Sequence, residues 1–86
     1  MEKRLGVIGI VVDHPDEVGA QVSQYISQHS SIIVGRMGIP YRQRGVSVIA
    51  LIVEGTTDEI GSLTGKLGNL NGVTVKSALT SKKFIE

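Results

Sequence analysis

The run from Leu5 to Val12 constrains the fold of this chain more than any other stretch, because it is apolar on both sides of a strand. Successive side chains of a strand point to opposite faces of the sheet. The two sets are Leu5, Val7 and Val11 on one face and Ile8, Ile10 and Val12 on the other. Such a strand belongs in the middle of a sheet. We expect one face to meet the chain's own helices and the other to meet a second chain.

The length of 86 residues predicts a single domain that spans residues 1–86. A domain of this size buries roughly 60% of the surface of its unfolded chain, so association would add usefully to its stability. The sequence holds no cysteine, which excludes disulfides, thiolate metal sites and cysteine nucleophiles. Its apolar residues are mostly Val, Ile and Leu, a composition that favours strands.

Charge and hydropathy narrow the classes of partner. A formal charge of +1 gives little long-range attraction to nucleic acid or acidic lipid, so neither is expected as a direct partner. The apolar runs are shorter than the span of about 18 residues that crosses a membrane. Residues 1–4 lead into a strand without the pattern of a signal peptide. We therefore expect a cytoplasmic protein.

Two segments carry the signals of helix starts. Pro15 suits the first position of a helix, and Asp16 and Glu17 place negative charge where the helix dipole is positive. Thr56 to Glu59, TTDE, matches a capping box, whose two end side chains bond free backbone N–H groups. The helices are expected to end within residues 28–31 and 68–72. Their apolar stripes are Val18, Val22, Tyr25 and Ile26 in the first and Ile60, Leu63, Leu67 and Leu70 in the second.

Residues 32–41, 46–53 and 73–79 predict three further strands. Pro40 places the first of them at an edge, and a polar turn joins it to the second as a hairpin. Residues 46–53 are apolar on both faces and predict another central strand, whereas residues 73–79 are apolar on one face. The resulting fold class is α+β: a ferredoxin-like βαββαβ sandwich with a four-stranded antiparallel sheet of order 4-1-3-2 and both helices on one face.

A sheet face without helices predicts a homo-oligomer, either a dimer or a tetramer. Each central strand offers three large aliphatic side chains to each face, and burying about six of them is worth on the order of 10 kcal/mol before association costs. We assign the interface to Ile8, Ile10, Ile49, Leu51 and Val53. The alternative is that long Lys and Arg side chains and the C-terminal tail cover this face.

A cluster of glycines lies on the second helix, opposite its leucine stripe: Gly61, Gly65 and Gly68. Glycine costs about 1 kcal/mol relative to alanine in an exposed helix. A close approach by another subunit would explain the cluster, so Gly61 and Gly65 join the predicted interface. Tolerated poor helix propensity is the alternative.

The motifs of familiar enzymes are missing. Gly6 to Gly9 lacks the third glycine of a dinucleotide-binding loop, and Gly61 to Leu67 has the wrong spacing for a phosphate loop. His14 and His29 lie outside any cluster with ligand spacing, so neither a metal site nor a cofactor is expected. No serine is placed beside a histidine base and an acid, so a nucleophilic triad has no support.

A candidate ligand site lies on the polar hairpin and is completed, in the oligomer, by the turn between the first strand and the first helix. Its predicted residues are Asp13, His14, Asp16, Arg36, Arg42 and Arg44. The arginines form the one concentration of fixed positive charge, which suits an anion or an effector. A solvated hairpin tip is the alternative for the arginines, and a helix start that faces water is the alternative for the histidine.

Several segments resemble known proteins. Val11 to Pro15, VVDHP, is similar to the strand-to-helix turn of ACT domains, where an Asp-x-Pro-Gly segment opens the first helix and helps bind a small effector; Asp16 stands in place of that glycine. Four further segments are similar to those of small stand-alone ACT-like proteins: GRMGIP at 35–40, GTTDEI at 55–60, LTGKLG at 63–68 and GVTVK at 72–76. These proteins are described as regulators of the iron-only hydrogenase system. The C-terminal domain of nickel-responsive repressors has a similar fold, but the cysteine of their nickel site has no counterpart here.

This resemblance implies a non-enzymatic regulatory protein. It would be an oligomeric ACT-like module that senses a small-molecule effector or binds a protein partner in the iron-only hydrogenase system. Two alternatives come from other classes. One is a small ferredoxin-like enzyme with a site at the subunit interface, using Arg36 with Asp13 or His14. The other is a purely structural oligomerisation module.

Overall fold

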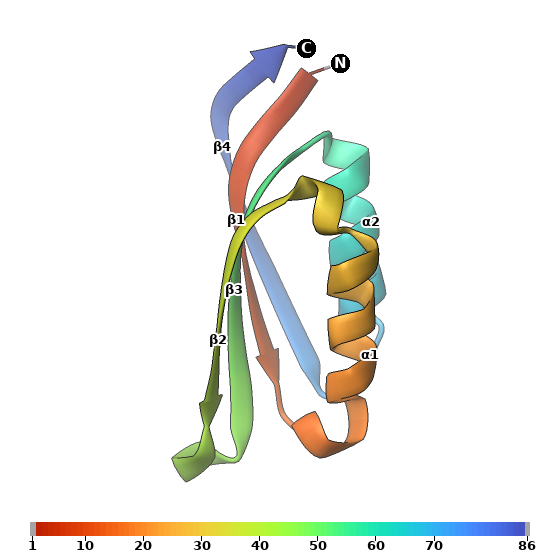
Figure 1. Ribbon diagram of the computed structural model, residues 1–86, viewed down its shortest axis with the longest axis vertical. Coiled ribbons are helices and arrows are strands. Elements are labelled where there is room, and N and C mark those ends of the chain that lie inside the picture. The colour runs from red at the N-terminus through yellow and green to blue at the C-terminus, as the bar shows by residue number, and fades with distance from the viewer. Residues whose placement is uncertain (1, 86) are drawn as a thin grey trace.

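The structure is a computed structural model that describes residues 2–85, and it confirms the predicted order of elements. Figure 1 shows the strands in one layer and the helices in a second. The elements are β1 (Glu2–Val12), α1 (Pro15–Gln28), β2 (Ile33–Tyr41), β3 (Val46–Gly55), α2 (Thr57–Gly68) and β4 (Val73–Ile85). Short 3-10 turns at Ser30–Ile32 and Arg42–Arg44 precede and follow β2.

The sheet has the strand order β2-β3-β1-β4, which is the predicted order 4-1-3-2 read from the other edge. All neighbouring strands are antiparallel. Both helices pack on the same face of the sheet (Figure 1). The fold is therefore the ferredoxin-like, ACT-like sandwich, with β1 and β3 in the centre and β2 and β4 at the edges.

The helix starts follow the predicted local chemistry. α1 begins at Pro15, whose missing N–H would have found no partner in the first turn. At α2 the Thr56 hydroxyl accepts a hydrogen bond from the Glu59 N–H at 3.1 Å, and the Glu59 carboxylate accepts one from the Thr56 N–H at 2.9 Å. This capping box lowers the pKa of the Glu59 carboxyl, chiefly because the backbone N–H of Thr56 stabilises its charged form.

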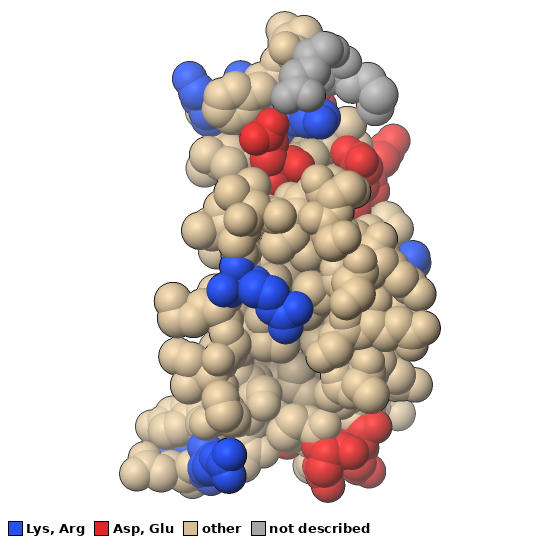
Figure 2. Space-filling view, in the orientation of Figure 1, with Lys and Arg blue, Asp and Glu red and all other residues tan. Residues whose placement is uncertain are grey.

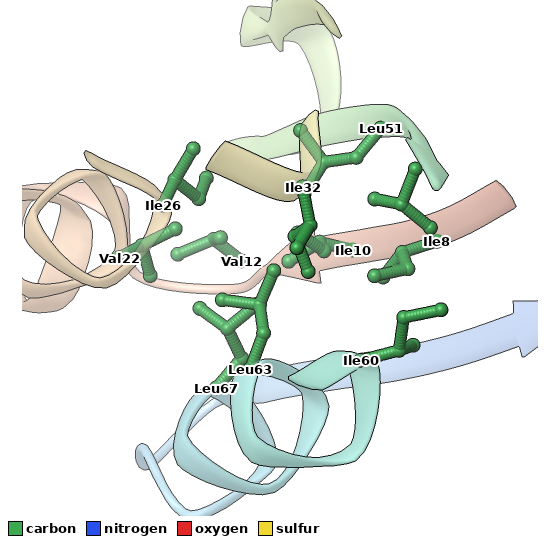
Figure 3. Packing of buried hydrophobic residues seen from close by; sticks show 11 residues of the cluster. Ile8, Ile10, Val12, Val22, Ile26, Ile32, Leu51, Ile60, Leu63 and Leu67 are labelled. Atoms are coloured by element: carbon green, nitrogen blue, oxygen red, sulfur yellow. The ribbon is translucent and has the colours of Figure 1, made fainter. Parts of the chain in front are cut away.

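The core lies between the sheet and the helix layer. Figure 3 shows side chains from α1 and α2 pointing toward those of the central strands. Its members are at most 5% exposed: Ile8, Ile10, Val12, Val22, Ile26, Ile32, Leu51, Val53, Ile60, Leu63 and Leu67. Both predicted helix stripes contribute to this core.

The predicted interface on the sheet was placed on the wrong face. Ile8, Ile10, Leu51 and Val53 are fully buried beneath the helices, and Ile49 packs against the same core. The four fully buried side chains cannot meet a second chain while the domain is folded. The physical reason is that strand periodicity sorts residues into two sets without saying which set the helices cover.

The face without helices, called the open face below, carries the opposite set. Residues paired in the strand ladders share a face, which assigns Val7, Gly9, Val11, Gly35, Met37, Ile39, Tyr41, Val46, Val48, Ala50 and Ile52 to it. Its large side chains are well exposed, among them Val7 at 47%, Ile52 at 48% and Met37 at 63%. The apolar surface that needs covering is therefore here.

β4 continues to Ile85, well beyond the predicted end at residue 79. Residues 2–4 of β1 pair with residues 83–85 of β4. A register shift between Arg4 and Gly6 separates this pairing from the rest of the ladder between the two strands. The Thr80 hydroxyl donates a hydrogen bond of 2.7 Å to the Leu5 carbonyl beside this irregularity. Figure 1 shows the resulting ribbon rising past the ends of the helices. Its run of polar residues has no alternation that would predict a strand.

Candidate functional site

One end of the sheet collects most of the predicted ligand residues. Val12, the last residue of β1, pairs with Ser47, which follows the β2–β3 hairpin closely. The turn that holds Asp13, His14 and Asp16 therefore lies at the same end as the hairpin. Figure 2 shows acidic atoms over the start of α1 and basic atoms over the hairpin at this end. Charges of opposite sign thus flank the end of the central strands.

The turn between β1 and α1 is held by the loop before β4. The Asp13 N–H donates a hydrogen bond of 2.7 Å to the Gly72 carbonyl. Gly72 has a φ of +72°, in the left-handed region that favours glycine, and it lies beside the His14 ring. The His14 Nδ1 lies 3.8 Å from a carboxylate oxygen of Glu17, with both side chains largely exposed. The backbone of this turn is fixed while its side chains reach solvent.

The hairpin displays its arginines on a short, closed turn. Arg42 and Arg44 lie in the 3-10 turn after β2, and both are exposed. Gly45 closes the turn with a φ of +68° and donates its N–H to the Arg42 carbonyl at 3.2 Å. Guanidinium groups can bind carboxylate or phosphate through paired hydrogen bonds. This tip is therefore able to hold an anion.

Arg36 lies apart from the other predicted ligand residues. It pairs with Leu51, four residues along β3 from Ser47, which corresponds to about 13 Å along the strand. Arg36 borders a different feature, a hollow of about 290 Å³ that is also lined by Gly35, Met37, Ala50 and Ile52. Within one chain, Arg36 cannot join Asp13 or His14 in one site.

A second hollow, of about 320 Å³, lies between the end of α1 and the start of α2. The residues that line it are mostly of polar types: Gln28, His29, Ser31, Ile32, Asp58, Glu59 and Ser62. The His29 Nδ1 lies 2.8 Å from the Tyr25 carbonyl, so this nitrogen carries the proton, and Nε2 faces the Ser62 hydroxyl at 3.5 Å. The sequence patterns placed His29 in no ligand site. The hollow depends on tertiary contact between two helices, which no local pattern reveals.

Within residues 2–85, no group of three or more His, Asp or Glu side chains is arranged to hold a metal ion. Neither helix in the described part of the chain is long and apolar enough to cross a membrane.

Comparison with known families gives one match over most of the chain. Residues 4–77 match the model of the TM1266-like family, described as "Iron-only hydrogenase system regulator, putative". Among solved structures, the chain is similar to the uncharacterized protein TM1266 from Thermotoga maritima, with 35% identity and a TM-score of 0.86. That alignment covers 90% of this chain and 96% of the Thermotoga protein. A search of curated proteins found no match.

More distant structures share the fold. The ACT domain from GTP pyrophosphokinase of Chlorobium tepidum has 22% identity and a TM-score of 0.68, over 93% of this chain and 89% of that domain. CPII, a nitrogen regulatory PII-like protein from Thiomonas intermedia, has 11% identity and a TM-score of 0.52, over 95% of this chain and 96% of that one. The structure of CPII contains ADP, AMP and bicarbonate.

Proposed function

Because this chain belongs to the TM1266-like family, described as regulators of the iron-only hydrogenase system, we propose that it is a cytoplasmic, non-enzymatic regulator. It works as a homo-oligomer and senses a small ligand or binds a protein partner. The observation that carries this proposal is the family match over residues 4–77. The ACT-like fold supports it, because small ferredoxin-like domains also occur in a PII-like protein whose structure holds nucleotides.

The ligand is proposed to bind at the end of the sheet where the β1–α1 turn meets the β2–β3 hairpin. Arg42 and Arg44 would hold an anionic group, and Asp13, His14 and Asp16 would face the rest of the molecule. Asp16 adds a carboxylate at the start of α1, where the usual ACT turn has glycine and allows close approach of the backbone. A ligand with both an anionic and a cationic or hydrogen-bond-donating group would suit these charges.

A thermal-shift panel of amino acids, nucleotides, inorganic anions and divalent metals tests this proposal. A ligand at about 100 times its dissociation constant stabilises the folded state by about 2.7 kcal/mol, which raises the melting temperature by roughly 10 °C or more in a chain of this size. The proposal expects one chemical class to give such a shift. The double variant Arg42→Ala/Arg44→Ala should lose it.

Arg36→Ala is the matched control, because it removes the same kind of side chain from a part of β2 that lies away from the hairpin turn. A shift that survives in Arg36→Ala and disappears in the double variant supports the site at the end of the sheet. A shift that is lost only in Arg36→Ala moves the ligand to the hollow beside β2. The absence of any shift contradicts the sensor and favours the structural module. Turnover of a bound compound would contradict the non-enzymatic role.

A further inference from the structure

The open face has a regular arrangement of large and small side chains. The strand ladders align it in rows across β2, β3 and β1. One row holds Ile39, Val48 and Val11, the next holds Met37, Ala50 and Gly9, and the third holds Gly35, Ile52 and Val7. None of these residues is charged, and the rows continue on β4 with Thr74, Lys76 and Ala78, of which only Lys76 carries a charge. The middle row is therefore low over β3 and β1 and is bordered by large aliphatic side chains.

The low middle of the open face is visible as a hollow. A space of about 290 Å³ is lined by Ala50, Ile52, Met37 and Gly35, with Arg36 at its border. Beside it Gly9 adds no side chain, and a Cβ there would find only the Lys76 carbonyl at 3.8 Å. Projecting groups and a hollow that could receive such groups thus lie on one surface. That combination permits the surface to pack against a copy of itself.

The size of the open face suits a subunit interface. Neighbouring strands lie about 4.8 Å apart, and each residue adds about 3.4 Å along a strand. A patch that is three strands wide and about seven residues long therefore has a flat area of roughly 300 Å², and β4 adds to it. Relief of the side chains adds to this accessible area. Such a patch matches the largest apolar patches of ordinary monomers, about 300–600 Å². With six large side chains that are 37–63% exposed standing out from it, and with β4 beside it, the face approaches the area of about 800 Å² that each partner buries in a standard interface.

We infer that a second copy of this chain packs on the open face, sheet against sheet, with a two-fold axis that passes beside Ala50. This inference rests on the proposed homo-oligomer and gives its geometry. A two-fold interface uses the same surface of both copies. The axis lies in the plane between the sheets, and Ala50 stands on the middle strand and in the middle row of the patch. Each Ala50 therefore lies opposite its own counterpart, across a gap of about 10 Å between sheets.

Single-cysteine crosslinking tests this geometry cleanly, because the natural chain has no cysteine. Ala50→Cys places one thiol beside the axis, and a bis-maleimide with a spacer that spans the gap between sheets should join most chains into covalent dimers. Ser23→Cys is the matched control on the exposed surface of α1. Its two thiols would have both sheets between them, so only traces of dimer are expected.

A charge on the open face gives an independent readout. Ile52→Lys should lower the mass in light scattering to that of one chain, because the exposed end of Ile52 would be buried in the dimer. Gln24→Lys, on exposed α1, adds the same charge and should leave the mass unchanged. Circular dichroism checks that each variant is folded. Met37→Lys, on edge strand β2, is the second variant and should act like Ile52→Lys.

The outcomes separate this inference from the proposed function. Crosslinking of Ala50→Cys but not Ser23→Cys, with dissociation by Ile52→Lys, supports the interface. A dimeric mass without Ala50→Cys crosslinking overturns the interface while the homo-oligomeric regulator stands. A monomeric wild-type chain overturns both the interface and the homo-oligomer. The thermal-shift panel reports ligand binding in every case, because it does not depend on mass.

Discussion

The two faces of the sheet are built from the same strands but meet different surroundings. On the covered face, Ile8 and Leu51 have no exposed surface, because the helices pack over them. On the open face, their sequence neighbours Val7 and Ile52 remain 47% and 48% exposed. Both pairs are aliphatic and stand opposite each other on β1 and β3. The difference teaches that the burial of a strand residue is decided by the layer above it.

The largest expected difference in stability is between substitutions at two consecutive residues of β3, one on each face of the sheet. Leu51→Ala should lower the free energy of unfolding by about 2–5 kcal/mol, since it leaves a cavity in the core. Ile52→Ala should cost at most about 1 kcal/mol in dilute solution. Its effect should grow with protein concentration, because only assembly buries Ile52 fully. Denaturant titrations at several protein concentrations measure both effects. Equal losses of unfolding free energy in dilute solution would contradict the difference between the two faces.

Glycine substitutions in β1 sharpen the same contrast. A Cβ on Gly6 would lie 2.9 Å from the Ala78 carbonyl oxygen and 2.6 Å from Leu79 Cδ2, so Gly6→Ala should cost about 1–3 kcal/mol. Gly9→Ala meets nothing closer than 3.8 Å and should leave the folded monomer nearly as stable as the wild type. Thermal melts of the two variants provide the comparison. A larger loss in Gly9→Ala at low protein concentration would contradict it.

The capping box fixes the start of α2, which covers part of the sheet. Thr56→Ala removes the hydroxyl that accepts the Glu59 N–H, and the expected loss is about 1 kcal/mol. In a chain of this size the melting temperature should fall by roughly 4–8 °C. Thr57→Ala, at the next and exposed position, is the control and should change it little. An unchanged melting temperature in Thr56→Ala would mean that the box adds no stability.

The glycines of α2 test whether its outer surface is also an interface. A Cβ on Gly65 meets nothing within 4 Å, so Gly65→Ala should raise the stability of the monomer by up to about 1 kcal/mol. The predicted interface role of Gly61 and Gly65 stays a prediction. If Gly65→Ala stabilises the protein and leaves its mass unchanged, the open face alone accounts for assembly. A fall in mass would bring the helix surface into the interface.

The smallest expected effect is a dependence on pH at Glu59. Its pKa in the folded state lies below the ordinary value of 4.5, so its carboxylate stabilises the fold above that pH and less as the pH falls through the lowered value. Glu59→Gln keeps an oxygen that can accept the Thr56 N–H but does not titrate. The melting temperatures of wild type and variant should therefore converge between neutral and acidic pH. A difference in melting temperature that grows as the pH falls would contradict this prediction.

Much of the fold follows from local signals in the sequence. Pro15 and the Thr56 capping box mark the helix starts correctly, and the alternation in β1 and β3 identifies the central strands. The choice of face was wrong because both sets of each central strand are apolar. A signal was present: Gly9 and Ala50 interrupt the outward set in the middle of the two strands, where the covered set has only large residues. A close-packed core leaves less room for such small side chains.

The candidate site was predictable only in part. The β1–α1 turn and the Arg42–Arg44 hairpin lie at one end of the sheet of a single chain, whereas the sequence had suggested that the turn completes the site in the oligomer. Arg36 does not join them, because its place depends on the register between β2 and β3. The hollow beside His29 was missed, since Ser62 comes from another helix and meets it only in the folded chain.

The mass of the wild-type chain in solution is the most direct test of the claim that the open face is covered by a second copy. Light scattering coupled to size exclusion at micromolar concentration should give at least twice the mass of one chain. Ile52→Lys under the same conditions should give the mass of one folded chain. A wild-type protein that is monomeric at this concentration would contradict the account.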